Sequence, residues 1–222
     1  MDAFRGIKVA DDFIDSREIE STTPASFLYQ SGYLSIREKQ GENLILDYPN
    51  MEVLSAVSKL FMEEKLGWLD AKTQVNDARV ALSHRNAYDF LKIYDTMLTS
   101  IPYDIYSREE KKYANKPKES FYHAMLHSML WGAGIHPISE KQSSRGRSDL
   151  EISINGYCYL IELKVAVGKE ACEKAADEAM SQIMKKGYAS QYEMSGITMI
   201  AIAVYNKMRC VGAHDIREFG GR

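Results

Sequence analysis

The segment from Ser148 to Val165 constrains the fold most, because it predicts a β-hairpin whose register follows from its turn. Asn155-Gly156 separates two runs of strand-forming residues, and Asn-Gly is typical of a two-residue type I′ turn. A turn of this length pairs Ile154 with Tyr157. Each further pair along the hairpin is then fixed by counting outward from this one.

The predicted register brings two acidic side chains together. Asp149 lies directly opposite Glu162, and Arg147 lies opposite Lys164. Because strand side chains alternate between faces, Asp149, Glu162 and Lys164 are expected on one face. The other face carries an unbroken apolar set that must point into a core: Leu150, Ile152, Ile154, Tyr157, Tyr159, Ile161 and Leu163.

Two directly opposed carboxylates, such as those of Asp149 and Glu162, destabilise a sheet unless another charge offsets them. At a separation of roughly 5 Å and an effective dielectric constant of about 20, their repulsion is about 3 kcal/mol. The neighbouring Lys164 or a hard divalent cation would offset it. Two carboxylates, a lysine and a metal suit phosphodiester hydrolysis. The alternative is that these are ordinary surface charges on a solvated strand face.

The chain from residue 119 onward predicts an α/β domain with a central mixed sheet. Its expected elements alternate in the order α, β, β, α, β, with a short edge strand at the end. Their expected residues are 119–131 (helix), 148–154 and 157–165 (strands), 170–192 (helix), 197–205 (buried strand) and 209–213 (edge strand).

Residues 1–107 predict a separate small module, mainly helical or winged-helix-like, with no catalytic signal. Its expected elements are a hairpin of 26–36 with 43–48 around Gln40-Gly41-Glu42, a helix from Asn50 to Gly67, and helices over 70–83 and 86–99. Residues 108–118 carry five positive and two negative side chains and are interpreted as a solvated linker. The alternative is a basic strip that touches nucleic acid.

Composition excludes several classes of protein. The 222 residues are 45% hydrophobic and 27% charged, which is typical of a globular protein rather than a disordered one. The net charge of −3 argues against a protein that coats nucleic acid non-specifically, so any phosphate contact would be local. Three widely spaced cysteines without a CxxC motif indicate buried thiols in a reducing compartment. No signal peptide or membrane span is evident, and a cytoplasmic protein is expected.

The residues of the hairpin also resemble a known family. Asp149 followed by Glu162-Leu163-Lys164 resembles the signature of the PD-(D/E)XK nuclease superfamily. The wider context is similar to the C-terminal domain of bacterial AAA-ATPase-like proteins, whose start resembles Glu119-Ser120-Phe121-Tyr122-His123. Residues 28–36 and 48–53 resemble the end of the ATPase-like region. No GxxxxGK[ST] loop occurs in this chain, so a P-loop is not expected to bind ATP here.

This resemblance implies a restriction-endonuclease-like αβββαβ core and a nuclease that depends on Mg²⁺ or Mn²⁺. It implies that Asp149, Glu162 and the carbonyl of Leu163 bind the metal and that Lys164 is the catalytic lysine. Glu119 would complete the acidic site, and Gln182 would support it from the following helix. Ser148 stands where the proline that gives the motif its name would be.

The expected partner is nucleic acid, in the first place DNA, with an ATPase domain or protein as a further candidate. Four basic residues are candidates for phosphate contacts: Arg145, Arg147, Lys185 and Lys186. For Arg145 and Arg147 the alternative is a solvated loop. His123 and His127 lie one helical turn apart, where packing is favoured over a metal pair. The alternative function is a catalytically silent domain that binds nucleic acid or regulates a larger ATPase-linked protein.

Overall fold

The computed structural model describes residues 6–14, 23–105, 119–139, 142–143, 146–147, 150–185 and 196–220. The chain forms two compact units, Met1–Val57 and Ser58–Arg222. This division lies well before the boundary expected at residue 107. The helices between these two positions supply side chains to the core of the second unit.

The first unit contains a three-stranded antiparallel sheet in the order β1-β3-β2. Its elements are β1 (Ile7–Ala10), the short helix η1 (Asp11–Ile14), α1 (Pro24–Gln30), β2 (Ser35–Gln40) and β3 (Asn43–Asp47). Gln40 pairs with Asn43 across Gly41 and Glu42, which confirms the expected hairpin turn. Gly41 adopts a φ of 63°, a conformation that favours glycine in a tight turn.

The first arm of the expected hairpin is wrong for residues 26–30, which lie in helix α1. The side chain of Thr23 accepts a hydrogen bond from the backbone N–H of Ser26, at 3.2 Å, and Pro24 occupies the first turn. Both features start a helix. They outweigh the apolar and aromatic composition that favoured a strand there.

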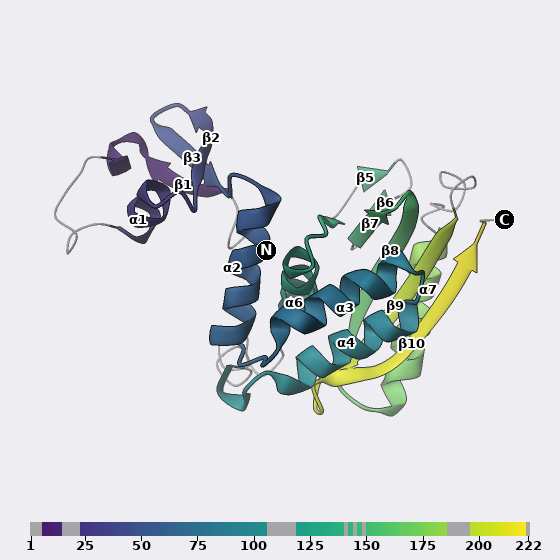
Figure 1. Cartoon of the computed structure of the whole chain (residues 1–222). Coiled ribbons are helices and arrows are strands. Elements are labelled where there is room, and N and C mark those ends of the chain that lie inside the picture. Colours follow the sequence, from purple (N-terminus) through teal and green to yellow (C-terminus); the bar gives the residue numbers. More distant parts are fainter. Residues whose placement is uncertain are drawn as a thin grey trace. The chain divides into compact units, whose positions relative to one another are not determined.

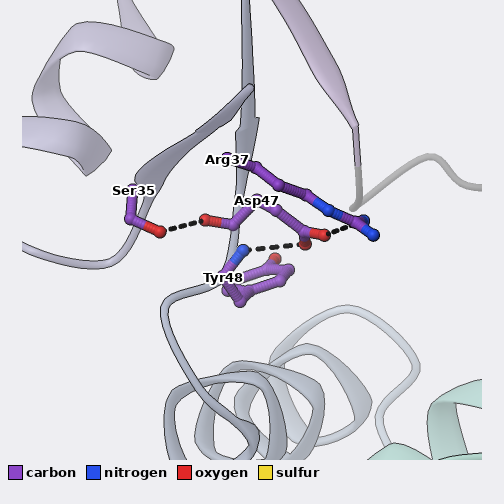
Figure 2. A network of polar contacts seen from close by, with 4 residues as sticks. All are labelled: Ser35, Arg37, Asp47 and Tyr48. Atoms are coloured by element: carbon purple, nitrogen blue, oxygen red, sulfur yellow. Dashed lines mark hydrogen bonds and ion pairs between the residues drawn. The ribbon is translucent and has the colours of Figure 1, made fainter. Parts of the chain in front are cut away.

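Asp47, at the end of β3, is buried and holds this end of the sheet together (Figure 2). Its carboxylate accepts hydrogen bonds from Arg37, at 3.0 Å, and from the backbone N–H of Tyr48, at 2.8 Å. Its carbonyl accepts one from the Ser35 hydroxyl, at 3.3 Å. Burial, followed by the charge of Asp47, raises the pKa of Tyr48.

Helix α2 (Met51–Glu64) begins at the N-cap that the sequence predicts. The side chain of Asn50 accepts a hydrogen bond from the backbone N–H of Val53, at 2.9 Å. Gly67, with a φ of 63°, follows the end of the helix.

The second unit contains helices α3 (Ala71–Ser83), α4 (Ala87–Ser100), α6 (Glu119–Gly132) and α7 (Glu170–Lys185). Its strands are β4 (Ile138–Ser139), β5 (Gln142–Ser143), β6 (Gly146–Arg147), β7 (Leu150–Ile154), β8 (Tyr157–Ala166), β9 (Ile197–Tyr205) and β10 (Cys210–Phe219). Five of them form a sheet in the order β10-β9-β8-β7-β4. Only β8 and β9 are parallel among its described neighbours, so the sheet is mixed. The elements from α6 to β9 follow one another as αβββαβ when the separate β5–β6 pair is set aside.

The β7–β8 hairpin has the register that the sequence predicts. Ile154 pairs with Tyr157, and the pairing continues without a shift to Leu150 and Ile161. Asn155 and Gly156 have φ values of 50° and 75°, as a type I′ turn requires. Arg147, which was expected opposite Lys164, instead pairs with Gln142 in the separate β5–β6 ladder.

Helices cover both faces of the five-stranded sheet (Figure 1). One face, which carries Leu150, Ile161 and Leu163, packs in a single core with α3, α4 and α6. Because α3 and α4 supply this core with residues such as Phe90 and Leu98, they belong to the second unit and not to a separate first module. The opposite face packs against α7, where Leu160 contacts a cluster that contains Met180 and Ile183.

The last strand of the second unit is longer than the sequence predicts. The short edge strand expected over 209–213 is the ten-residue strand β10, which pairs with β9 along its length except for a bulge between Val211 and Ala213. Cys158 and Cys172 are free and buried, as expected, whereas Cys210 is free but only partly buried. Across the parts of the chain that the structure describes, no helix is long and apolar enough to cross a bilayer.

Candidate functional site

Glu162 is a fully buried carboxylate near the end of β8, with 0% of its surface exposed. Side chains alternate along β8, so Glu162 lies on the same face as Leu160, the face that α7 covers. The interpretation of this face as a solvated one with ordinary surface charges is therefore wrong for Glu162. A buried carboxylate is costly unless positive charge or hydrogen bonds stabilise it, so its position calls for a partner.

Lys164 supplies that positive charge and links two acidic residues. Its Nζ lies 3.5 Å from Oε1 of Glu162 and 3.5 Å from Oε1 of Glu119. The side chain of Lys164 is 26% exposed and that of Glu119 is 41% exposed, so the group runs from the interior to the surface. The first residue of α6 and the end of β8 thus meet at one lysine.

The carbonyl of Leu163 points to the side of β8 on which β7 lies, near the start of β7. In a two-residue hairpin the closing pair, Ile154 and Tyr157, exchanges hydrogen bonds, and so does every second pair after it. Leu163 belongs to this series, whose backbone groups point toward β7. Cys158 belongs to the alternate series and donates its N–H to the carbonyl of Gly196 on the β9 side. The carbonyl of Leu163 therefore points to the β7 side of β8 and not to the β9 side.

The structure places the other predicted site residues as follows. Gln182 is half-buried on α7, the helix that covers the face of Glu162. Lys185 is exposed at the last residue of α7, and Arg147 lies in β6. Asp149, Arg145 and Lys186 lie outside the described residues.

The oxygen atoms that surround Lys164 are of the kind that binds a hard divalent cation. Glu119, Glu162 and the carbonyl of Leu163 offer oxygen ligands, which Mg²⁺ and Mn²⁺ prefer. Within the residues that the structure describes, no three His, Cys, Asp or Glu side chains form a group suited to a metal ion. The sequence predicts Asp149 as a further ligand, and this residue lies outside the part of the chain that the structure describes.

Glu151, which was not predicted as a site residue, is a second carboxylate that is only 5% exposed. It lies on β7, paired with Leu160, on the same face as Glu162. The strand period could have found it, since it lies two residues after Asp149. His127 packs against the ring of Trp131, with ring centroids 5.2 Å apart, in keeping with a packing role rather than a metal pair with His123.

The order of elements, the hairpin register and the lysine between two glutamates agree with one family. Residues 117–213 match the PD-(D/E)XK nuclease superfamily. This match covers the five-stranded sheet up to the start of β10, both helices that flank the site, and the motif residues Glu162 and Lys164. The superfamily implies a restriction-endonuclease-like fold, and its nucleases typically use divalent metals.

A curated relative extends the similarity over almost the whole chain. An uncharacterized protein from the vnfD 5′ region of Azotobacter chroococcum mcd 1 is 26% identical over 98% of this chain. The chain spans 42% of the length of that relative. No solved structure matches the chain.

Proposed function

We propose that the PD-(D/E)XK segment is a metal-dependent nuclease that hydrolyses phosphodiester bonds in DNA. The observation that carries the proposal is the buried Glu162 beside Lys164, which also contacts Glu119. A fully buried carboxylate two residues before a partly exposed lysine matches the E-x-K part of the superfamily motif. A purely structural ion pair would have no need of the second acidic residue, Asp149, that the sequence predicts beside Glu162.

The metal would be held by oxygen atoms of three residues: Asp149, Glu162 and, through its backbone carbonyl, Leu163. When bound, Mg²⁺ or Mn²⁺ would lower the pKa of a bound water and polarise the phosphate. Burial of Glu162 keeps one ligand rigid and shielded from water, which strengthens its attraction for a cation.

Lys164 would act as a catalytic residue through its compact ammonium group. The two glutamates at 3.5 Å hold Nζ at the border between the interior and the surface, where it can stabilise negative charge that develops on the phosphate. Glu119 would orient this lysine and complete the acidic site. Gln182 would support the site from α7.

Basic residues would contact the phosphates of the DNA. Lys185 is exposed at the end of α7, and we propose that it contacts phosphates together with Arg145, Arg147 and Lys186. We further propose that the first unit, which contains the residues 28–36 and 48–53 that resemble the end of an ATPase-like region, serves an ATPase-like domain or partner protein. Contacts between basic side chains and phosphates position the nucleic acid without reading its sequence.

The experiment that tests the proposal is a cleavage assay on single- and double-stranded DNA and on RNA, with Mg²⁺ or Mn²⁺ and with EDTA. The variant Glu162→Gln keeps the shape of the side chain but removes its charge, and we expect it to abolish cleavage. Glu151→Gln is the matched control, because it neutralises another buried carboxylate on the same face of the hairpin.

Two outcomes would contradict a nuclease at this site. Cleavage that survives Glu162→Gln would place the chemistry elsewhere. DNA binding by the wild-type chain without cleavage in any metal would instead support the alternative of a catalytically silent binding domain.

A further inference from the structure

Strand β10 forms an edge of the five-stranded sheet, and its outer side is long enough to pair with another strand. It pairs with β9 on one side, and no described strand lies on its other side. An exposed edge of this length is a template for strand addition unless the protein blocks it. What another strand could bind are the backbone N–H and C=O groups that β10 points away from β9.

The pairing of the inner strands identifies those groups. Cys158 donates its N–H to the carbonyl of Gly196, so the even-numbered residues of β9 bond to β8 and the odd-numbered ones bond to β10. Ala213, Asp215, Arg217 and Phe219 pair with odd-numbered residues of β9 and point their backbone groups inward. The backbone groups of three residues point outward: His214, Ile216 and Glu218.

Helix α4 provides a partner for the outer edge at the start of β10. The N–H of Val211 also points outward, but it donates to the carboxylate of Asp95 on α4, at 2.6 Å. Beyond the bulge that follows Val211, the edge from Ala213 to Phe219 runs to the end of the strand. Ile216 is the central residue of that run.

We propose that two copies of this chain pair antiparallel through β10, about a two-fold axis that passes at Ile216. Because β10 pairs with itself, the register fixes every opposite residue. Arg217 then faces Asp215 of the second copy, Glu218 faces His214, and Phe219 faces Ala213. The three outward residues all exchange backbone hydrogen bonds with the second copy.

The alternation of charge selects this register over its neighbours. Moving the axis by one residue would place Asp215 opposite Asp215 or Arg217 opposite Arg217, and like charges directly opposite each other destabilise a sheet. Charges on an edge strand often serve to prevent pairing. Here one register places Asp215 opposite Arg217 on both sides of the axis and brings no like charges directly opposite each other, in addition to the contact that Arg217 makes with Asp215 of its own chain, at 2.7 Å.

Exposed apolar side chains flank the same edge on both faces of the sheet. Tyr88 is 65% exposed and packs edge-on against His214 on one face. On the other face, Met184 is 46% exposed and contacts Arg217. Phe219, at the end of the edge, is 39% exposed. A second copy seated on β10 brings these side chains close to its own, which removes apolar surface from water.

The test is the mass of the full chain in solution, measured by sedimentation and light scattering over a range of concentrations. We expect a species of twice the 25.2 kDa chain mass. Arg217→Glu places two acidic residues opposite each other and should shift the chain to a monomer. Combining Asp215→Arg with Arg217→Asp restores opposite charges across the axis and should restore the dimer.

Two further variants separate this edge from general effects. Ile216→Pro removes an outward N–H that the sheet of a single copy does not use, and should also give a monomer. Lys207→Glu makes the same change of charge as Arg217→Glu in the exposed β9–β10 turn, outside the paired run, and should remain dimeric. A monomeric wild-type chain at every concentration would overturn the proposal, and so would a dimer that Ile216→Pro and Arg217→Glu leave intact. Circular dichroism checks that each variant is folded.

Discussion

At the scale of single residues, polar side chains hold the interior together at a few defined points. Tyr159 is buried in the sheet and donates a hydrogen bond to the carbonyl of Leu82 in α3, at 2.5 Å. Burial, together with the neighbouring Tyr157, raises the pKa of Tyr159, and Arg85 only partly opposes this. The phenol therefore stays protonated in the folded chain at a pH where the unfolded chain has lost the proton.

This shift predicts how stability depends on alkaline pH. The free energy of unfolding should be insensitive to Tyr159 below its ordinary pKa of 10.0 and should fall as the pH rises above it, because the unfolded state then releases a proton that the folded state keeps. Tyr159→Phe should cost about 1–3 kcal/mol at neutral pH by leaving the Leu82 carbonyl without this donor. It should also flatten the alkaline decline in urea unfolding experiments. The exposed Tyr88→Phe is the control, and an equally steep decline in Tyr159→Phe would contradict the assignment.

At the scale of elements, the turn of the β7–β8 hairpin determines where the site residues lie. The register of this hairpin could be predicted from Asn155-Gly156 alone, because a two-residue turn leaves a single pairing. The position of Glu162 on the face opposite the apolar set followed from it. That this face is covered by α7 could not be predicted, since Glu162 and Lys164 look like surface residues in sequence.

Gly156→Ala tests this dependence on the turn. With a φ of 75° and no atom within 4 Å of an added Cβ, the alanine meets only backbone strain, expected at about 1–2 kcal/mol. Gly168→Ala is the matched control, because its added Cβ also meets nothing within 4 Å and its φ is not in the left-handed region. Urea unfolding should separate the two variants, and equal stability of both would argue against a type I′ turn.

For other elements, the local sequence is not sufficient to predict their type, length or packing partners. The aromatic residues after Ser26 favoured a strand, although the Thr23-Pro24 start makes residues 24–30 helical. The edge strand was expected to end at Ala213, although residues 214–219 continue its pairing with β9. Helices α3 and α4 were predicted within a residue or two, but their packing partners lie far along the chain and no local pattern reveals them.

At the scale of the whole molecule, a bound ion should stabilise the folded chain. A ligand that binds only the folded state at about 100 times its Kd contributes about 2.7 kcal/mol. Mg²⁺ or Mn²⁺ should therefore raise the Tm by several degrees. Asp149→Asn should reduce this shift while leaving the metal-free chain equally stable or more so, because it removes a carboxylate opposite Glu162. Equal shifts in wild type and variant, measured by scanning calorimetry, would count against a metal site here.

The measurement that tests the central claim most directly is the cleavage rate of Lys164→Arg. If Lys164 only neutralises Glu119 and Glu162, the guanidinium of arginine can replace it; if it stabilises the reacting phosphate, a compact ammonium is required. We predict that the variant keeps its fold, its metal-induced Tm shift and most of its DNA affinity, and that its cleavage rate falls by about 10²–10³. An arginine variant that cleaves DNA at close to the wild-type rate would contradict the catalytic role of Lys164.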